Sequence, residues 1–168
     1  VRAAHGTMDE ALYPRLAKLP LVTLASPIIE IRAQATDPFG TVHSLRIVGL
    51  DALVAAPLAP TLIPRYEHGE DARSMLSAQA IALNASAQKA LQVKPGDTVA
   101  VRWGANPAVT LRVMGSIMAT GEPTGMMDIA GVQTQFNQLG QLSRIDLQLA
   151  PGATMESVQA AMRLPPGL

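Results

Sequence analysis

Few side chains in this sequence are arranged for catalysis or metal binding. Three histidines are present, and they lie far apart: His5, His43 and His68. None belongs to an HExxH pair or has a second ligand four residues away, as zinc sites require. Adjacent carboxylates occur at Asp9-Glu10 and Glu70-Asp71, positions typical of a first helical turn and of a charged loop. We predict no catalytic, metal or cofactor-binding residue, and ligand-binding residues stay unassigned.

Serine and glycine motifs give no further candidates. Ser116 follows a glycine but is not in a GxSxG elbow, and no glycine-rich loop ends in Lys-Ser or Lys-Thr. The Lys94-Pro95-Gly96-Asp97 segment could be a ligand loop, but we favour a turn between a helix and a strand. Four methionines are close in sequence: Met114, Met118, Met126 and Met127. They could line a site for an apolar partner, although core filling is the simpler interpretation.

Composition excludes some partners. The chain of 168 residues has 13 basic and 13 acidic residues and only 3% aromatics. Without a basic run or rings for stacking, nucleic acid is not expected as a partner. There is no cysteine, which leaves the redox compartment open. No apolar run reaches the about 20 residues of a membrane-spanning helix, and the absence of an initial Met or a leader pattern suggests a piece of a longer protein.

The stretch from 80 to 118 has the clearest local signals. Alternation predicts a strand at 80–83, and Asn84 should cap a helix that ends before Lys94-Pro95. Alternation over 98–103 and 109–114 then predicts a hairpin with one solvated face.

The N-terminal part should hold a helix and a hairpin. Thr7 and Glu10 have the spacing of a capping box, with Met8, Leu12, Leu16 and Leu19 as the apolar stripe. Pro14 requires either a kink or a later start near Tyr13. Residues 21–33 predict a strand that is bulged or at an edge because of Pro27, and a turn at 36–40 leads to a returning strand over 42–50.

The remaining segments alternate between connections and short elements. Residues 52–78 lack periodicity and read as a connection, and 121–125 as a second linker. Asp128 should cap a helix with Ile129, Val132, Phe136 and Leu139 inward. A half-buried strand follows at 143–149. Thr154 should cap a last helix with Met155, Val158 and Met162 inward, ended by Pro165-Pro166.

This order predicts an α+β fold: a split lobe from residues 1–50 and 122–168, and an inserted β-rich lobe with one helix from 51–121. The chain contains the following segments, in this order: LAKLPLVTLASPII, RIVGLDA, ALNASAQKALQVKPGDTVAVRW, MMDIAGVQTQF, SRIDLQLAPGATMESVQAAM and LPPG. Through these segments, nearly the whole chain resembles the extracytoplasmic domain of MacB-like and FtsX-like ABC transporter permeases.

The resemblance implies a porter-like α/β lobe with an inserted β-rich lobe, located at the periplasmic face of a bacterial inner membrane. It implies no enzyme activity in this domain, and ATP hydrolysis by a separate cytoplasmic subunit. The expected partners are the transmembrane helices of the parent chain, a second permease subunit, the ATP-binding subunit, and a periplasmic or lipid-linked partner.

Two alternatives stay open. The strand, capped helix, PGD turn and strand also resemble a double-psi barrel, which would favour a cofactor-binding or enzymatic domain. The other alternative is a free-standing module that binds an apolar ligand through a methionine-lined groove.

Overall fold

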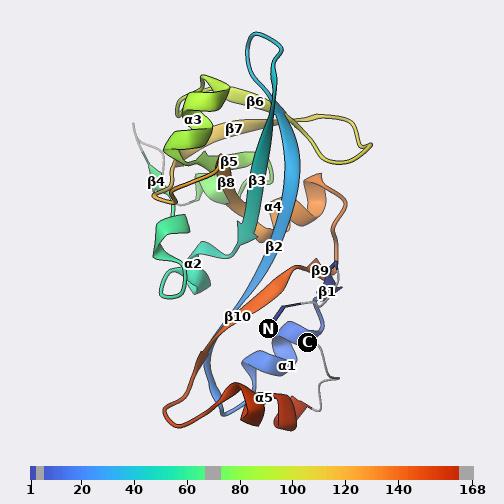
Figure 1. Cartoon of the computed structure of the whole chain (residues 1–168), viewed down its shortest axis with the longest axis vertical. Helices are drawn as coiled ribbons and strands as arrows, with labels where there is room; N and C mark the ends of the chain where they lie inside the picture. The colour runs from blue at the N-terminus through green and yellow to red at the C-terminus, as the bar shows by residue number, and fades with distance from the viewer. Residues whose placement is uncertain (3–5, 67–72, 163–168) are drawn as a thin grey trace.

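The longest element of the computed structural model is the strand β2 (Val22–Thr36), which runs along the molecule from end to end (Figure 1). The structure describes residues 1–2, 6–66 and 73–162. The other strands are β1 (Met8–Asp9), β3 (Val42–Leu50), β4 (Arg65–Tyr66), β5 (Ala80–Leu83), β6 (Thr98–Arg102), β7 (Val109–Ser116), β8 (Thr124–Asp128), β9 (Gln141–Leu142) and β10 (Arg144–Leu149). The helices are α1 (Leu12–Ala17), α2 (Ala52–Ala55), α3 (Ala85–Leu91), α4 (Ile129–Gln135) and α5 (Met155–Met162).

One mixed sheet contains most of these strands. Its order is β10-β2-β3-β8-β5-β7-β4, and β6 closes against both β2 and β7. β3 and β8 are parallel, as are β5 and β7, while the other pairs are antiparallel. The α+β class predicted from the sequence is confirmed.

The buried side chains form three clusters. The large cluster joins β2, β3, β5, β6, β7, α3 and α4: Ile29, Ile31, Leu45, Ile47, Ile81, Leu83, Leu91, Val99, Val101, Leu111, Val113, Val132 and Phe136. The middle cluster lies under α2 and includes Leu50, Ala55, Met75, Met114 and Met126. The end cluster joins α1, α5, β10 and the start of β2: Met8, Leu16, Val22, Ala25, Leu142, Ile145, Val158 and Met162. The boundaries of the inserted lobe, predicted at residues 51 and 121, stay a prediction.

The signals in the 80–118 stretch are confirmed. The Asn84 side chain accepts a hydrogen bond from Ala87 N–H at 2.9 Å and so caps α3. α3 ends at Leu91, its C-cap Gln92 has a left-handed φ of 54°, and the turn at 94–97 follows. β6 and β7 form the hairpin, with Val99, Val101 and Leu111 buried.

The predicted capping box at Thr7 is wrong. Met8 and Asp9 pair with Leu142 and Gln141 as strand β1, and α1 starts only at Leu12. Pairing with β9 therefore overrides the local helix signal. The later start puts Pro14 in the first turn of α1, where its missing N–H costs little.

The linker predicted at 121–125 is wrong from Thr124 onward, because β8 begins there. Met126 and Met127 are both buried, in different clusters, so β8, which lies between β3 and β5, has no alternation of apolar and polar residues to reveal it. Gly125 allows the close approach: a Cβ there would meet Ile81 Cδ1 at 2.6 Å.

Two inward side chains were also predicted wrongly. Leu139 is exposed because α4 ends before it, and Met155 is partly exposed in the first turn of α5. Of the other predicted core positions of these helices, Val132, Phe136, Val158 and Met162 are buried, and Ile129 is partly buried. Asp128 caps α4 through Ala130 N–H, and Thr154 accepts from Ser157 N–H at the start of α5. Pro165-Pro166 lies outside the described residues.

Pro27 sits where β2 has a partner on one side only. It lies opposite Ile145 of β10, while β3 ends at Leu50, which faces Ile28. The predicted edge position is confirmed locally, although β2 is central along the rest of its length.

Candidate binding site

Among the described residues, those considered as reactive do not come together in one site. His43 Nε2 lies 3.2 Å from Asp37 Oδ2 in the β2–β3 turn. Burial alone would raise the pKa of Asp37, but hydrogen bonds from Thr41 N–H, His43 and Phe39 N–H hold this pKa below its ordinary value. His5, His68 and Glu70-Asp71 lie outside the described residues. In the part of the chain that is described, no group of three or more His, Cys, Asp or Glu could hold a metal.

The other candidates have structural partners. Asp9 Oδ1 accepts from Ala11 N–H, and Glu10 Oε2 accepts from the side chain of Gln133 on α4 at 3.0 Å. Ser116 Oγ accepts from Gln88 Nε2 at 3.0 Å. These contacts connect elements, and none of them pairs a nucleophile with a base.

The four methionines that are close in sequence do not form one site. Met127 belongs to the large cluster, Met114 and Met126 to the middle cluster, and Met118 is 53% exposed. Met126 instead joins Met75, far away in sequence, in the wall of a pocket.

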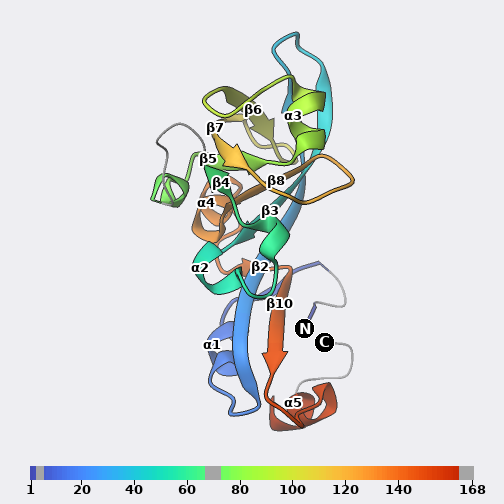
Figure 2. The same cartoon turned by 90° about the vertical axis from the view of Figure 1, so that its left-hand side faces the viewer.

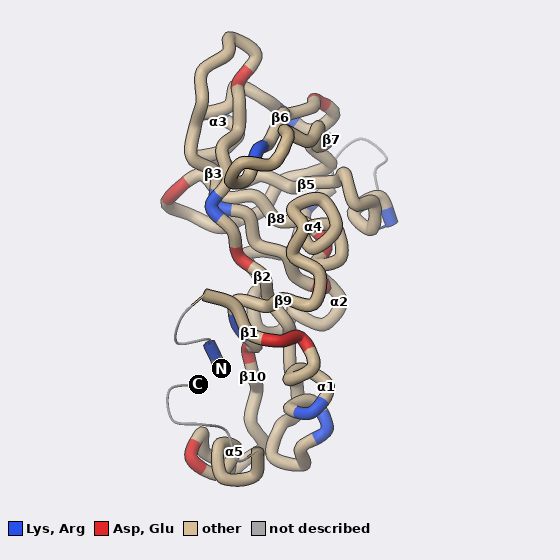
Figure 3. The backbone as a smooth tube through the Cα atoms, turned by 90° about the vertical axis from the view of Figure 1, so that its right-hand side faces the viewer, with Lys and Arg blue, Asp and Glu red and all other residues tan. Residues whose placement is uncertain are grey.

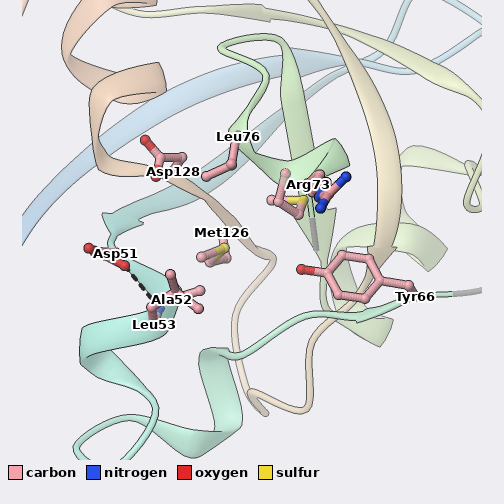
Figure 4. Close-up of a pocket in the computed structure, with 9 residues that line it drawn as sticks. Asp51, Ala52, Leu53, Tyr66, Arg73, Leu76, Met126 and Asp128 are labelled. Carbon is pink, nitrogen blue, oxygen red and sulfur yellow. Dashed lines mark hydrogen bonds between the residues drawn. The ribbon is translucent and has the colours of Figure 1, made fainter. Parts of the chain in front are cut away.

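This pocket has a volume of about 260 Å³ and opens between α2, β8 and the turn at 74–76 (Figure 4). Its wall is mainly apolar: Ala52, Leu53, Met75, Leu76 and Met126. Asp51 and Asp128 lie on one side, and Tyr66 and Arg73 lie on the other. We call it the Met126 pocket.

Strand pairing brings the two carboxylates together. β3 and β8 are parallel neighbours, with Leu50 opposite Asp128, so both strands end at the same edge. Asp51 then caps α2 through Leu53 N–H at 2.9 Å, and Asp128 caps α4 through Ala130 N–H at 2.9 Å. Burial raises the pKa of Asp128, and the negative charge of Asp51 raises it further.

The pocket can bind but shows no means of catalysis. Its apolar wall would take a hydrophobic group, and its acidic side would favour a nearby cation. Sequence reasoning predicted a strand that ends at residue 50, next to Asp51, and predicted that Asp128 caps a helix. It missed their proximity because no strand was predicted before Asp128, and the first two residues of β8 were assigned to the linker at 121–125.

Comparisons with known proteins place this fold among the extracytoplasmic domains of ABC transporter permeases. The periplasmic region of MacB from Actinobacillus actinomycetemcomitans superposes with a TM-score of 0.68 at 13% identity, covering 95% of this chain and 75% of that one. The extracellular domain of the noncanonical ABC-type transporter YknZ from Gram-positive bacteria gives a TM-score of 0.67 at 14% identity, covering 90% and 78%. No curated protein matches the sequence.

The sequence itself identifies the family. Residues 2–164 match the family described as the MacB-like periplasmic core domain. The chain belongs to this family and is a periplasmic domain of an ABC transporter permease, as the sequence resemblance predicted. Such domains belong to transporters with transmembrane and ATPase parts, and this is not a known enzyme family. Over the described residues, no helix has the length and apolarity needed to cross a bilayer.

Proposed function

We propose that this domain is a non-catalytic coupling element, which transmits ATP-driven motion of the transmembrane helices to a substrate or partner in the periplasm. The observation that carries the proposal is β2, since this strand contributes to both the end cluster and the large cluster. A hydrogen-bonded strand of 15 residues is a stiff connection between the two ends of the molecule.

The described ends of the chain lie together at one end of the molecule. Val1 packs against the end cluster, and its carbonyl accepts from Ile145 N–H at 2.7 Å. Met162, the last described residue, is buried in the same cluster. Figure 2 shows the elements of this cluster, α1, α5 and β10, grouped away from α3, β6 and β7. Membrane helices joined to both ends would therefore act on the end cluster.

An ionic network reinforces the connection between the clusters. Glu30 on β2 accepts from Arg46 Nε of β3 at 2.7 Å and from an Arg144 terminal nitrogen of β10 at 2.6 Å. The hydrogen bond from Arg46 outweighs burial and, with Arg144, lowers the pKa of Glu30 to about 2. Figure 3 shows acidic and basic positions close together along β2 and β3. Motion of β10 would thus reach β3 through Glu30.

A cross-link between the clusters tests the coupling. The domain lacks cysteine, so two can be added without background from it. Glu10→Cys with Gln133→Cys, joined by a short bis-maleimide, ties the β1–α1 segment to α4, because these side chains are in contact at 3.0 Å. In the full-length permease with its ATP-binding subunit in nanodiscs, we expect this cross-link to reduce ATP turnover.

The control uses the same bis-maleimide to join two strands that both contribute to the large cluster. Ala100→Cys with Thr110→Cys links two exposed residues that face each other on β6 and β7. This link should leave ATP turnover unchanged. If both cross-linked proteins hydrolyse ATP at the same rate as the unlinked proteins, the coupling role is contradicted.

The division into a lobe of residues 1–50 and 122–168 and an inserted lobe of 51–121 is likewise proposed. A second permease subunit and the ATP-binding subunit are the proposed partners within the complex. The family assignment takes the place of the double-psi barrel alternative. The apolar-ligand alternative retains one supporting observation, the Met126 pocket.

A further inference from the structure

The Met126 pocket is of a size that suits side chains of a protein. Its volume of about 260 Å³ is below the roughly 300–1,000 Å³ of small-molecule sites. An apolar cavity of roughly 150 Å³ accepts a benzene-sized group. The pocket therefore has room for one or two large apolar side chains.

Exposed apolar surface continues outside the pocket. Leu53 on α2 is 86% exposed and Leu76 is 69% exposed, and both are at its wall. Hydrophobic side chains at this exposure gain free energy when a partner covers them. The surface that would be covered thus extends from the pocket onto its rim.

The two carboxylates lie on one side of the pocket, opposite Arg73, and at that side they select the kind of partner. Asp51 accepts a hydrogen bond from a backbone N–H of α2, and Asp128 accepts one from a backbone N–H of α4. Neither carboxylate forms an ion pair within the described residues. The two negative charges repel each other across the ends of parallel strands. A cation next to the pocket would relieve this repulsion, whereas an anion would increase it.

We propose that the Met126 pocket docks a protein partner in the periplasm through one or two apolar side chains flanked by Lys or Arg. This deepens the proposed function, because it rests on the domain engaging a partner outside the membrane. Apolar side chains would contact Met75 and Met126, and the cation would lie beside Asp51 and Asp128.

Methionine-methyl NMR of the 168-residue chain tests the chemistry directly. The probe is a short capped peptide of alternating Leu and Lys. We expect saturable shifts at the methyls of Met75 and Met126, while those of Met8 and Met162 in the end cluster stay in place. The same peptide with Glu in place of Lys should bind about two- to fivefold more weakly, as for a partly exposed charge pair.

Two sets of variants separate charge from apolar contact. Asp51→Asn with Asp128→Asn removes both charges but keeps helix caps, since Asn caps nearly as well as Asp. It should abolish the preference for Lys over Glu. Leu53→Gln with Leu76→Gln alters only exposed side chains and should weaken both peptides.

Other results would overturn the proposal. Equal affinity for the Lys and Glu peptides, or absence of shifts at Met75 and Met126, would exclude this chemistry. Hexylammonium binding as tightly as the Lys peptide would indicate a small amphiphile. Concentration-dependent shifts without peptide would indicate a second copy of the chain. If the NMR test fails while the Glu10–Gln133 cross-link still reduces ATP turnover, only the docking site is refuted.

Discussion

Replacing Glu30 by Gln should destabilise the domain by about 1–2 kcal/mol at neutral pH. A pKa of about 2, against an ordinary value of 4.5, corresponds to roughly 3.4 kcal/mol at about 1.4 kcal/mol per pH unit. The Glu30 side chain is 24% exposed, and its partners Arg46 and Arg144 are 28% and 16% exposed. Solvent screening reduces the expected loss to about 1–2 kcal/mol.

The effect should depend on pH in a defined direction. Because folding lowers the pKa of Glu30, its contribution is complete above the unfolded pKa of 4.5 and is lost as pH falls toward about 2. Urea unfolding of wild type and Glu30→Gln at a series of pH values measures the difference. The two proteins should differ at neutral pH and converge in acid.

Glu156→Gln is the matched control, since Glu156 is an exposed residue in the first turn of α5. Its effect on the urea midpoint should be much smaller. Equal stability of wild type and Glu30→Gln at neutral pH would refute the network as a stabilising connection. A loss that does not change with pH would assign the effect to packing and not to charge.

Three further substitutions, one of them with an exposed control, test the packing. Asn84→Ala should cost about 2–4 kcal/mol in urea unfolding, because the buried amide accepts from Ala87 N–H and Thr124 N–H and donates to two carbonyls. Phe136→Ala should cost about 3–5 kcal/mol, whereas Phe39→Ala, at a position 77% exposed, should stay within about 0.5 kcal/mol; similar losses would contradict the core assignment. Gly115→Ala should cost about 1–3 kcal/mol, since its Cβ would collide with the Arg65 carbonyl; an unchanged melting temperature would contradict the close approach of β4.

Local sequence signals correctly predicted the elements for which no long-range strand pairing competes with the local structure. Asn84 caps α3 because its side-chain oxygen is within reach of Ala87 N–H, whatever surrounds the helix. The turn after β2 forms for a similar reason, with Asp37 Oδ1 accepting from Phe39 N–H and Thr41 N–H. The Thr7 signal failed because Met8 pairs with Leu142, a residue far along the chain.

The alternation of apolar and polar residues could not predict the candidate site, because the site depends on the order of the strands in the sheet. β8 is buried on both faces, so its sequence looks no different from a short apolar connection. Once it lies parallel to β3, Asp51 and Asp128 meet at one edge. Each residue could be interpreted locally as a cap, but their proximity is a property of strand order.

The pairing of β2 has a consequence for the order in which the protein can fold. The first half of β2 pairs with β10: Ser26 lies opposite Asp146, and Ala25 lies opposite Leu147. These pairs can form only after both strands have been synthesised. Contacts between residues so distant in sequence form slowly, because a long loop must close first. During synthesis the apolar start of this strand is thus made about 120 residues before its neighbour on β10. That interval is when aggregation, or protection by a chaperone, would matter most.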